Sequence, residues 1–186
     1  MIRRTVLAVG IALGAIALSS CSAADHPNAV ATVDDAVLTQ DDLEQLLNNQ
    51  VVQEALSIGQ PTNGMADVET QADAVISVWI VLEAIAAHDA ASLDDEAPAS
   101  SILATAGTEF EQSFAAATGP TRDLIIRYIA FQTQNQAGTL NSDAMRTAVQ
   151  SADIHVDSRY GYWDEAKASV LPFDSAAATT TAPTTT

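Results

Sequence analysis

Cysteine, basic residues and aromatic residues are scarce in this chain of 186 residues. A single cysteine excludes any disulfide within the chain. Lys and Arg total 7 against 24 Asp and Glu, which gives a formal net charge of −17. Because binding to nucleic acid depends on neutralising phosphates with Lys and Arg, we expect no nucleic-acid partner.

Apolar residues are plentiful, at 48% of the chain, so the length and composition suit one domain with a real hydrophobic core. The acidity has two interpretations. It keeps the protein soluble and suppresses self-association, or it forms a specific acidic binding face. The first is the more general explanation and the one we favour from the sequence.

The N-terminus has the pattern of a secretory signal peptide. Arg3 and Arg4 form a short basic start, residues 5–18 carry no charge, and small residues precede Cys21. The uncharged stretch is shorter than the roughly 20 apolar residues that a membrane-spanning helix needs. The alternatives are an ordinary signal peptide with an incidental cysteine, and an uncleaved anchor.

The four residues Leu-Ser-Ser-Cys at 18–21 resemble the lipobox of bacterial lipoproteins. That resemblance implies cleavage after residue 20 and lipid attachment to the thiol of Cys21. More than one acyl chain would be needed there, because a single chain gives only marginal membrane binding. It also implies that the domain works on the extracytoplasmic face of the cell membrane. Without residues 1–20 the charge would be 5 − 24 = −19, and a modified Cys21 would be closed to thiolate catalysis and metal ligation.

Residues 21–28 read as a lipidated spacer, followed by a folded domain at 29–174 and a disordered Ala/Thr-rich tail at 175–186. Strands are predicted at 29–33, 37–38 and 154–156, and we expect the first and the last to pair, because such short strands are not stable alone. Five helices are predicted, at 40–56, 67–90, 99–117, 121–137 and 141–151. The fold class is therefore mainly α, a helical domain closed by a small sheet from its two ends.

The predicted helices carry apolar stripes with helical spacing. Thr39 is the expected N-cap of the first helix, with Asp41 and Asp42 in its first turn. Trp79 lies in the middle of the most apolar helix and is predicted to be core. The third helix is predicted to turn inward Ile102, Ala106, Phe110 and Phe114, at i, i+4, i+8 and i+12.

No catalytic or metal-binding pattern is present. His26, His88 and His155 lack the i, i+4 spacing of a zinc site, and no acidic cluster has the ligand order of a calcium loop. No serine lies in a Gly-x-Ser-x-Gly turn, and no glycine-rich phosphate loop occurs. We therefore expect no cofactor, no metal and no enzymatic activity.

An aromatic segment near the C-terminus supplies the candidate peptide-binding residues, Tyr160, Tyr162 and Trp163. Tyr and Trp around Gly161 could form an exposed ledge, since such residues anchor many interfaces. The alternative, which we favour, is that they fold back over the end of the helical core and that Gly161 permits the tight turn.

Two segments resemble the SurA/PrsA-type extracytoplasmic chaperones. Residues 30–43 (VATVDDAVLTQDDL) resemble the opening of their chaperone domain, in which a strand, a turn and a short apolar pair precede a capped, Leu-rich helix. Residues 157–164 (DSRYGYWD) resemble the C-terminal signature of short lipoproteins of that type. The turn departs from the family, which usually has Asn-Gly where this chain has Asp34 and Asp35.

The resemblance implies a chaperone-like domain without the parvulin prolyl isomerase, because residues 99–153 show no strand pattern for that domain. The expected function is binding of unfolded or exported polypeptides by a membrane-anchored lipoprotein. The alternative is a structural or interaction lipoprotein that docks on one cell-envelope partner. The client and the oligomeric state are not indicated.

Overall fold

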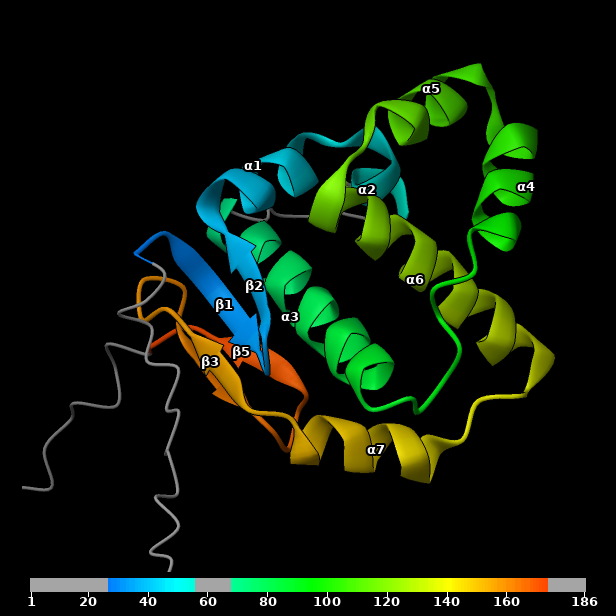
Figure 1. The fold of residues 1–186 in the computed structure, drawn as a ribbon. Coiled ribbons are helices and arrows are strands. Elements are labelled where there is room, and N and C mark those ends of the chain that lie inside the picture. Colours follow the sequence, from blue (N-terminus) through cyan, green and yellow to red (C-terminus); the bar gives the residue numbers. More distant parts are fainter. Residues whose placement is uncertain (1–26, 56–67, 174–186) are drawn as a thin grey trace, which may run out of the picture.

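The computed structural model describes residues 27–55 and 68–173 (Figure 1). The predicted signal peptide, Cys21, residues 56–67 and the predicted Ala/Thr-rich tail lie outside the described residues. Within them the chain forms seven helices and five short strands, so the prediction of a mainly helical domain with a small sheet is confirmed. Two of the five predicted helices, those at 40–56 and 99–117, are each divided into two.

The small sheet joins the two ends of the chain, as predicted. Strands β1 (Ala29–Val33), β2 (Ala36–Thr39) and β3 (Ile154–Val156) pair antiparallel in the order β2-β1-β3. Asp34 turns the chain between β1 and β2 with φ of 50°, a conformation that Asp adopts more readily than most residues. Its amide donates to the Asp153 carbonyl and its carboxylate accepts from the Asp153 amide, both at 2.9 Å. This turn thereby fixes the start of β3.

Helix α1 (Gln40–Asn48) begins at the predicted N-cap and ends earlier than predicted. Thr39 and Asp42 form a capping box, in which each side chain accepts from the other residue's amide. The chain leaves the helix at Asn49, whose ψ is 123°. The Asn49 side-chain oxygen then accepts from the amides of Val51 and Val52 and starts α2 (Gln50–Ala55). The single predicted helix is therefore two.

Helix α3 (Val68–Ala87) is the centre of the domain, with the sheet on one side and α6 and α7 around it (Figure 1). Val75, Ile76 and Ile80 have no exposed surface, and Trp79 is buried as predicted. A helix apolar on nearly all sides is a core helix because its neighbours cover every face. No helix of the described part is long and apolar enough to span a membrane.

The predicted third helix is also divided. Helix α4 (Glu96–Ala106) is capped by Asp95, and Gly107 then separates it from α5 (Thr108–Ala116) with φ of 131°. Helix α6 (Gly119–Ala137) ends at Gly138 in the left-handed conformation, and Asn141 caps α7 (Ser142–Ser151). The division at Gly107 turns α5 away from the axis of α4, so their apolar residues do not form one inward stripe.

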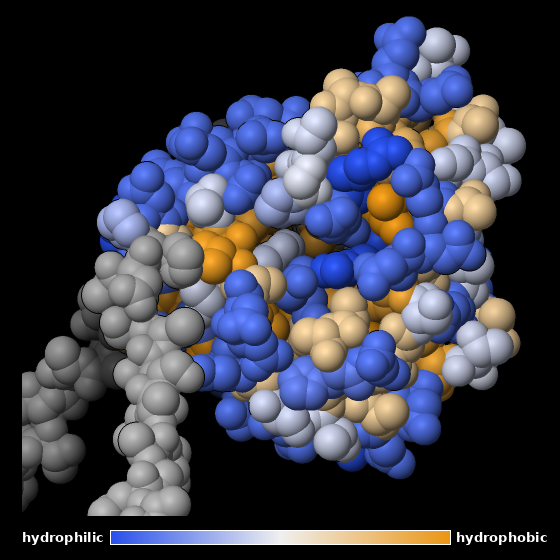
Figure 2. All heavy atoms as spheres, in the orientation of Figure 1, coloured by the Kyte–Doolittle hydropathy of each residue, from blue (hydrophilic) through white to orange (hydrophobic). Residues whose placement is uncertain are grey.

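A second antiparallel pair, β4 (Tyr162–Asp164) with β5 (Ser169–Leu171), was not predicted. It packs on α3 through Val170, which is buried. The Val170 amide donates to the Ser77 hydroxyl at 2.8 Å, and that hydroxyl donates to the Asp73 carbonyl at 2.6 Å. The hydroxyl of Ser77 in the apolar helix is thus used to hold this hairpin. On the face drawn in Figure 2, apolar atoms reach the surface only as patches among hydrophilic ones.

Candidate functional site

An apolar groove of about 380 Å³ lies between α2, α4, α5 and α6. Its lining is mostly aliphatic and aromatic, with polar side chains on α2 and along α6. The apolar residues are Val51, Ile102, Leu103, Ala106, Phe110, Tyr128 and Ile129, and the polar ones are Glu54, Gln132, Thr133 and Gln136. A concave apolar surface with a few polar groups is the usual form of a binding site.

Ile102 is the residue that distinguishes this groove from a gap in the core. Ile102 is 45% exposed, whereas the adjacent Leu103 is buried. The predicted inward position of Ile102 is therefore wrong, because α4 ends at Gly107 and turns only Ala99 and Leu103 fully into the core. Phe110 and Tyr128 are half-buried, so each presents part of its ring to the groove.

Arg122 holds the α4–α5 wall against α6. Its guanidinium stacks over the Phe114 ring at 4.3 Å from the centroid and donates to the Phe114 carbonyl at 3.1 Å. It also donates to the Glu96 carboxylate at 2.5 Å. A cation at the end of α5 complements the carbonyls that the helix leaves unpaired. One side chain therefore joins α6 to the end of α5 and the start of α4.

Arg127, five residues further along α6, ties this helix to α3 and to the segment before α4. It pairs with Glu83 on α3 and, at 2.7 Å, with Asp94 before α4, and the side chains of Arg127 and Glu83 are each 17% exposed. Burial raises the pKa of Glu83 despite the neighbouring Arg127. Burial lowers the pKa of Arg127, but its bonds to Asp94 and Glu83 outweigh that effect and leave the pKa raised. The adjacent Tyr128 and Ile129 are thereby positioned in the groove.

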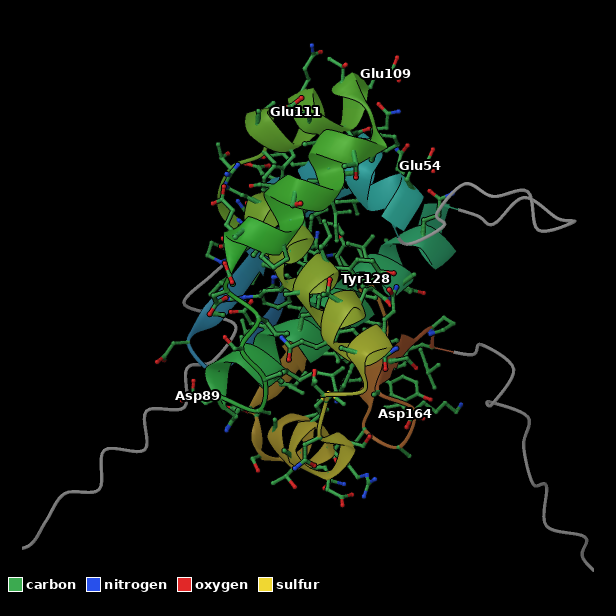
Figure 3. The ribbon with its side chains drawn as sticks, turned by 90° about the vertical axis from the view of Figure 1, so that its right-hand side faces the viewer. Glu54, Asp89, Glu109, Glu111, Tyr128 and Asp164 are labelled. Atoms are coloured by element: carbon green, nitrogen blue, oxygen red, sulfur yellow. The ribbon has the colours of Figure 1, made fainter. Side chains whose placement is uncertain are left out.

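The charge around the groove has one sign. Glu54 lines it, and Glu109 and Glu111 flank Phe110 on α5. Figure 3 shows these three carboxylates toward the same end of this face, with Tyr128 further along on α6. No Lys or Arg belongs to its described lining.

The aromatic segment divides between the two predicted roles. Tyr160 and Trp163 pack against the hydrophobic core, as the favoured interpretation has it. Tyr162 is 44% exposed, and its ring centroid lies 5.5 Å from that of Phe173, itself 60% exposed. These two rings form a small exposed pair, not a ledge of three aromatic residues.

The segment also contains a hollow of about 240 Å³, which reaches from Arg159 and Gly161 to Phe173. Arg159 pairs with Asp157 at 3.0 Å, and its hydrogen bond holds the pKa of Asp157 below the ordinary value. The Asp157 amide donates to the Val30 carbonyl, so this pair lies where β3 leaves β1. The Arg159–Asp157 pair therefore has a structural role at this turn of the chain. The hollow beside it has a less apolar lining than the groove.

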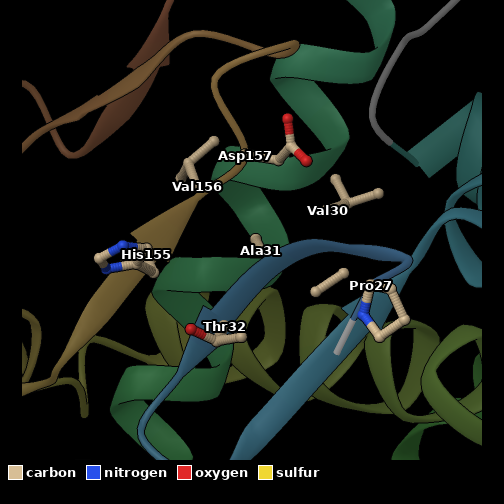
Figure 4. Close-up of a pocket in the computed structure, with 8 residues that line it drawn as sticks. Pro27, Val30, Ala31, Thr32, His155, Val156 and Asp157 are labelled. Atoms are coloured by element: carbon tan, nitrogen blue, oxygen red, sulfur yellow. The ribbon is translucent and has the colours of Figure 1, made fainter. Parts of the chain in front are cut away.

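A smaller hollow, of about 70 Å³, lies beside β1 and β3. Figure 4 shows His155, Thr32 and Asp157 at separate edges of it, so their polar atoms do not converge on one point. His88, at the end of α3, lies 3.2 Å from the Asp34 carboxylate and has a structural partner there. Among the described residues, no three His, Cys, Asp or Glu side chains form a group that could hold a metal ion.

Comparison with protein-family models, with curated proteins and with solved structures found no match to this chain. Sequence reasoning missed the groove as a site. The one signal that could have indicated it was Gly107, in the middle of a predicted helix.

Proposed function

We propose that the chain is a membrane-anchored extracytoplasmic lipoprotein whose folded domain is a chaperone-like module. It binds unfolded or exported polypeptides in the groove and has no prolyl isomerase activity. The observation that carries the proposal is an apolar groove with Ile102, Phe110 and Tyr128 partly open to solvent. The resemblance of the two chain ends to SurA/PrsA-type chaperones supports the same class.

The size and chemistry of the groove suit a polypeptide segment. A volume of about 380 Å³ accepts a few apolar side chains, not a folded surface. The amides of Gln132 and Gln136 offer both donors and acceptors beside them, which suits the backbone of an extended client. Contacts of this kind favour weak and reversible binding, because little area is buried against the cost of ordering the client.

The position of the proposed anchor leaves the groove accessible. Figure 1 shows β1, which follows the spacer, on one side of the domain and α4 on the other. Five residues lie between Cys21 and Pro27, so the attachment would extend at most about 20 Å. Such a tether keeps the β1 side nearest the membrane, and α4 on the far side.

The proposal predicts that Ile102→Gln weakens suppression of client aggregation. Ile102 is already 45% exposed, so the substitution should change stability by less than about 0.5 kcal/mol. It removes about 1 kcal/mol of apolar contact with a bound client, which corresponds to about fivefold in affinity. The measurement is light scattering by a chemically denatured client in the presence of residues 22–174 without lipid.

Tyr162→Gln is the matched control, because Tyr162 is equally exposed and lies outside the groove. Equal suppression by the parent protein and Tyr162→Gln, with loss in Ile102→Gln, supports the groove. Loss in Tyr162→Gln alone would move the site to the exposed aromatic pair. A well-folded parent domain without any suppression would favour the alternative, a lipoprotein that docks on one envelope partner.

Anchoring makes a separate prediction. Cys21→Ala should abolish incorporation of a labelled acyl-chain precursor in a bacterial host and release the protein from the membrane fraction, because the thiol is the proposed site of lipid attachment. Ser22→Ala is the control and should label like the parent chain. Labelling of the Cys21→Ala protein would contradict the lipoprotein assignment and leave the groove argument untouched.

A further inference from the structure

We infer that the groove prefers apolar segments flanked by Lys or Arg, an inference that deepens the proposed function and rests on it. The apolar lining of the groove provides affinity for any exposed hydrophobic segment. The carboxylates at one end of it add a selection by charge, and these two features come from different residues.

The local charge is carried by Glu54, Glu109 and Glu111. Glu54 lies within the lining, and the other two flank Phe110, whose ring forms part of it. All three are exposed. Within residues 27–55 and 68–173 none of the three forms an ion pair, and Figure 3 shows them around the same end of the face that carries Tyr128.

The basic residues that could offset this charge are already paired. Each of the five Lys and Arg residues in the described part lies within 4 Å of a carboxylate: Arg122, Arg127, Arg146, Arg159 and Lys167. Arg122 and Arg127 bond to Glu96, Glu83 and Asp94, not to the groove carboxylates. The groove end therefore presents uncompensated negative charge to a client.

A client with basic flanks gains from this charge in two ways. Each exposed ion pair is worth roughly 0.2–1 kcal/mol, so three of them change affinity by about threefold or more. A field of one sign also accelerates the encounter with an oppositely charged chain. Both effects weaken as salt shortens the Debye length from about 10 Å at 0.1 M to about 3 Å at 1 M. A client with acidic flanks is repelled by the same carboxylates, so its affinity and its rate of encounter are lowered.

The overall net charge of −17 would also attract any cation, so the experiment must separate local from global charge. The groove variant is Glu54→Gln with Glu109→Gln and Glu111→Gln. The control variant is Asp35→Asn with Asp89→Asn and Glu165→Gln, which removes the same charge from exposed residues outside the groove lining. Asp89 has φ of 50°, and Asn tolerates that conformation.

The test uses the full chain in phosphatidylcholine vesicles and three labelled peptides with one apolar core, flanked by Lys, Ser or Glu. We expect the Lys-flanked peptide to bind about tenfold more tightly than the Glu-flanked one at low salt, by fluorescence anisotropy. The groove variant should reduce that ratio to about twofold, the control variant should leave it above about fivefold, and 1 M salt should abolish it in the parent chain.

Equal binding of the Lys- and Glu-flanked peptides would overturn the inference. So would an equal reduction in the control variant, because the attraction would then belong to the whole body. The Ser-flanked peptide separates this failure from that of the proposed function. If it binds the parent chain and binds Ile102→Gln about fivefold less, the groove stands without charge selection. If it binds neither, the proposed function fails.

Discussion

Gly161→Ala is expected to lower the free energy of unfolding by about 4 kcal/mol, while Gly107→Ala lowers it by about 1–2 kcal/mol. Both glycines have a backbone conformation that residues with a Cβ avoid, with φ of 118° and 131°. The strain from φ is therefore similar at the two positions. The reduced entropy of the unfolded chain on replacing glycine also cancels between them.

The difference between the two positions is space. A Cβ at Gly161 would overlap the carbonyl oxygen of Leu171 and lie 2.8 Å from its carbonyl carbon and 3.3 Å from the Cα of Pro172. These are backbone atoms of β5 and the residue after it, so no side chain can move aside. At Gly107 nothing lies within 4 Å of an added Cβ. The extra loss at Gly161 is the cost of separating β5 from the chain that approaches it.

Urea denaturation of both variants, followed by Trp fluorescence, measures the two losses. Trp163 lies in the β4–β5 hairpin and Trp79 in the core, so local opening and global unfolding give distinct changes. Equal losses in the two variants would show that backbone strain alone matters at Gly161. The close packing of Gly161 against Leu171 would then have no energetic role.

The sequence was sufficient for the features that depend on neighbouring residues or on strong periodicity. The N-cap at Thr39, the end of the fourth predicted helix at residue 137 and the burial of Trp79 were predicted and are confirmed. The pairing of residues 29–33 with 154–156 was also predicted, because strands this short are not stable alone, and it is confirmed. Capping and apolar spacing depend on residues that are close together in the chain, so they can be recognised directly in the sequence.

The helix breaks at Asn49 and Gly107 could not be predicted with the same rules. Asn and Gly inside a helical pattern cost at most about 1 kcal/mol each, which packing often overcomes. Here packing favours the break, because the Asn49 side chain caps α2 and also donates to the Ser113 carbonyl of α5 at 3.4 Å. The strand pair β4–β5 was missed because its three-residue strands carry no detectable alternation.

The groove was not predictable for a related reason. Its lining comes from four helices, and two of them exist only because of the unpredicted breaks. Ile102 fits an inward stripe when 99–117 is one helix, and it becomes an exposed residue when the helix ends at Gly107. A site that depends on tertiary placement follows from the sequence only when the element boundaries are right.

Arg127→Met is expected to destabilise the fold by about 3 kcal/mol at neutral pH, and by less than half of that near pH 5. The substitution leaves the Glu83 carboxylate, which is 17% exposed, without its cation. Met occupies much of the volume of the Arg stem, so the loss of packing is small. An uncompensated carboxylate in a mostly buried place is the main source of the cost.

The pH dependence follows from the pKa of Glu83. Burial already raises it in the folded protein, even with Arg127 present. Removing Arg127 raises the folded-state pKa further, whereas the pKa in the unfolded chain stays at its ordinary value. A carboxyl group with a raised folded-state pKa favours folding most below its unfolded pKa and loses that contribution as pH rises through the folded pKa. The variant therefore loses most stability at high pH.

Glu83→Gln with Arg127→Met is the control that tests this cause, since it removes the charge that Arg127→Met leaves behind. The double variant should recover most of the stability at neutral pH and should lose the added pH dependence, as measured by urea denaturation between pH 5 and pH 8. If Arg127→Met is equally destabilised across that range, the contribution of Arg127 is the packing of its stem and its bond to Asp94. The position of α6 beside the groove would then not depend on the charge of Glu83, and binding by Ile102 and Tyr128 should be independent of pH in the same range.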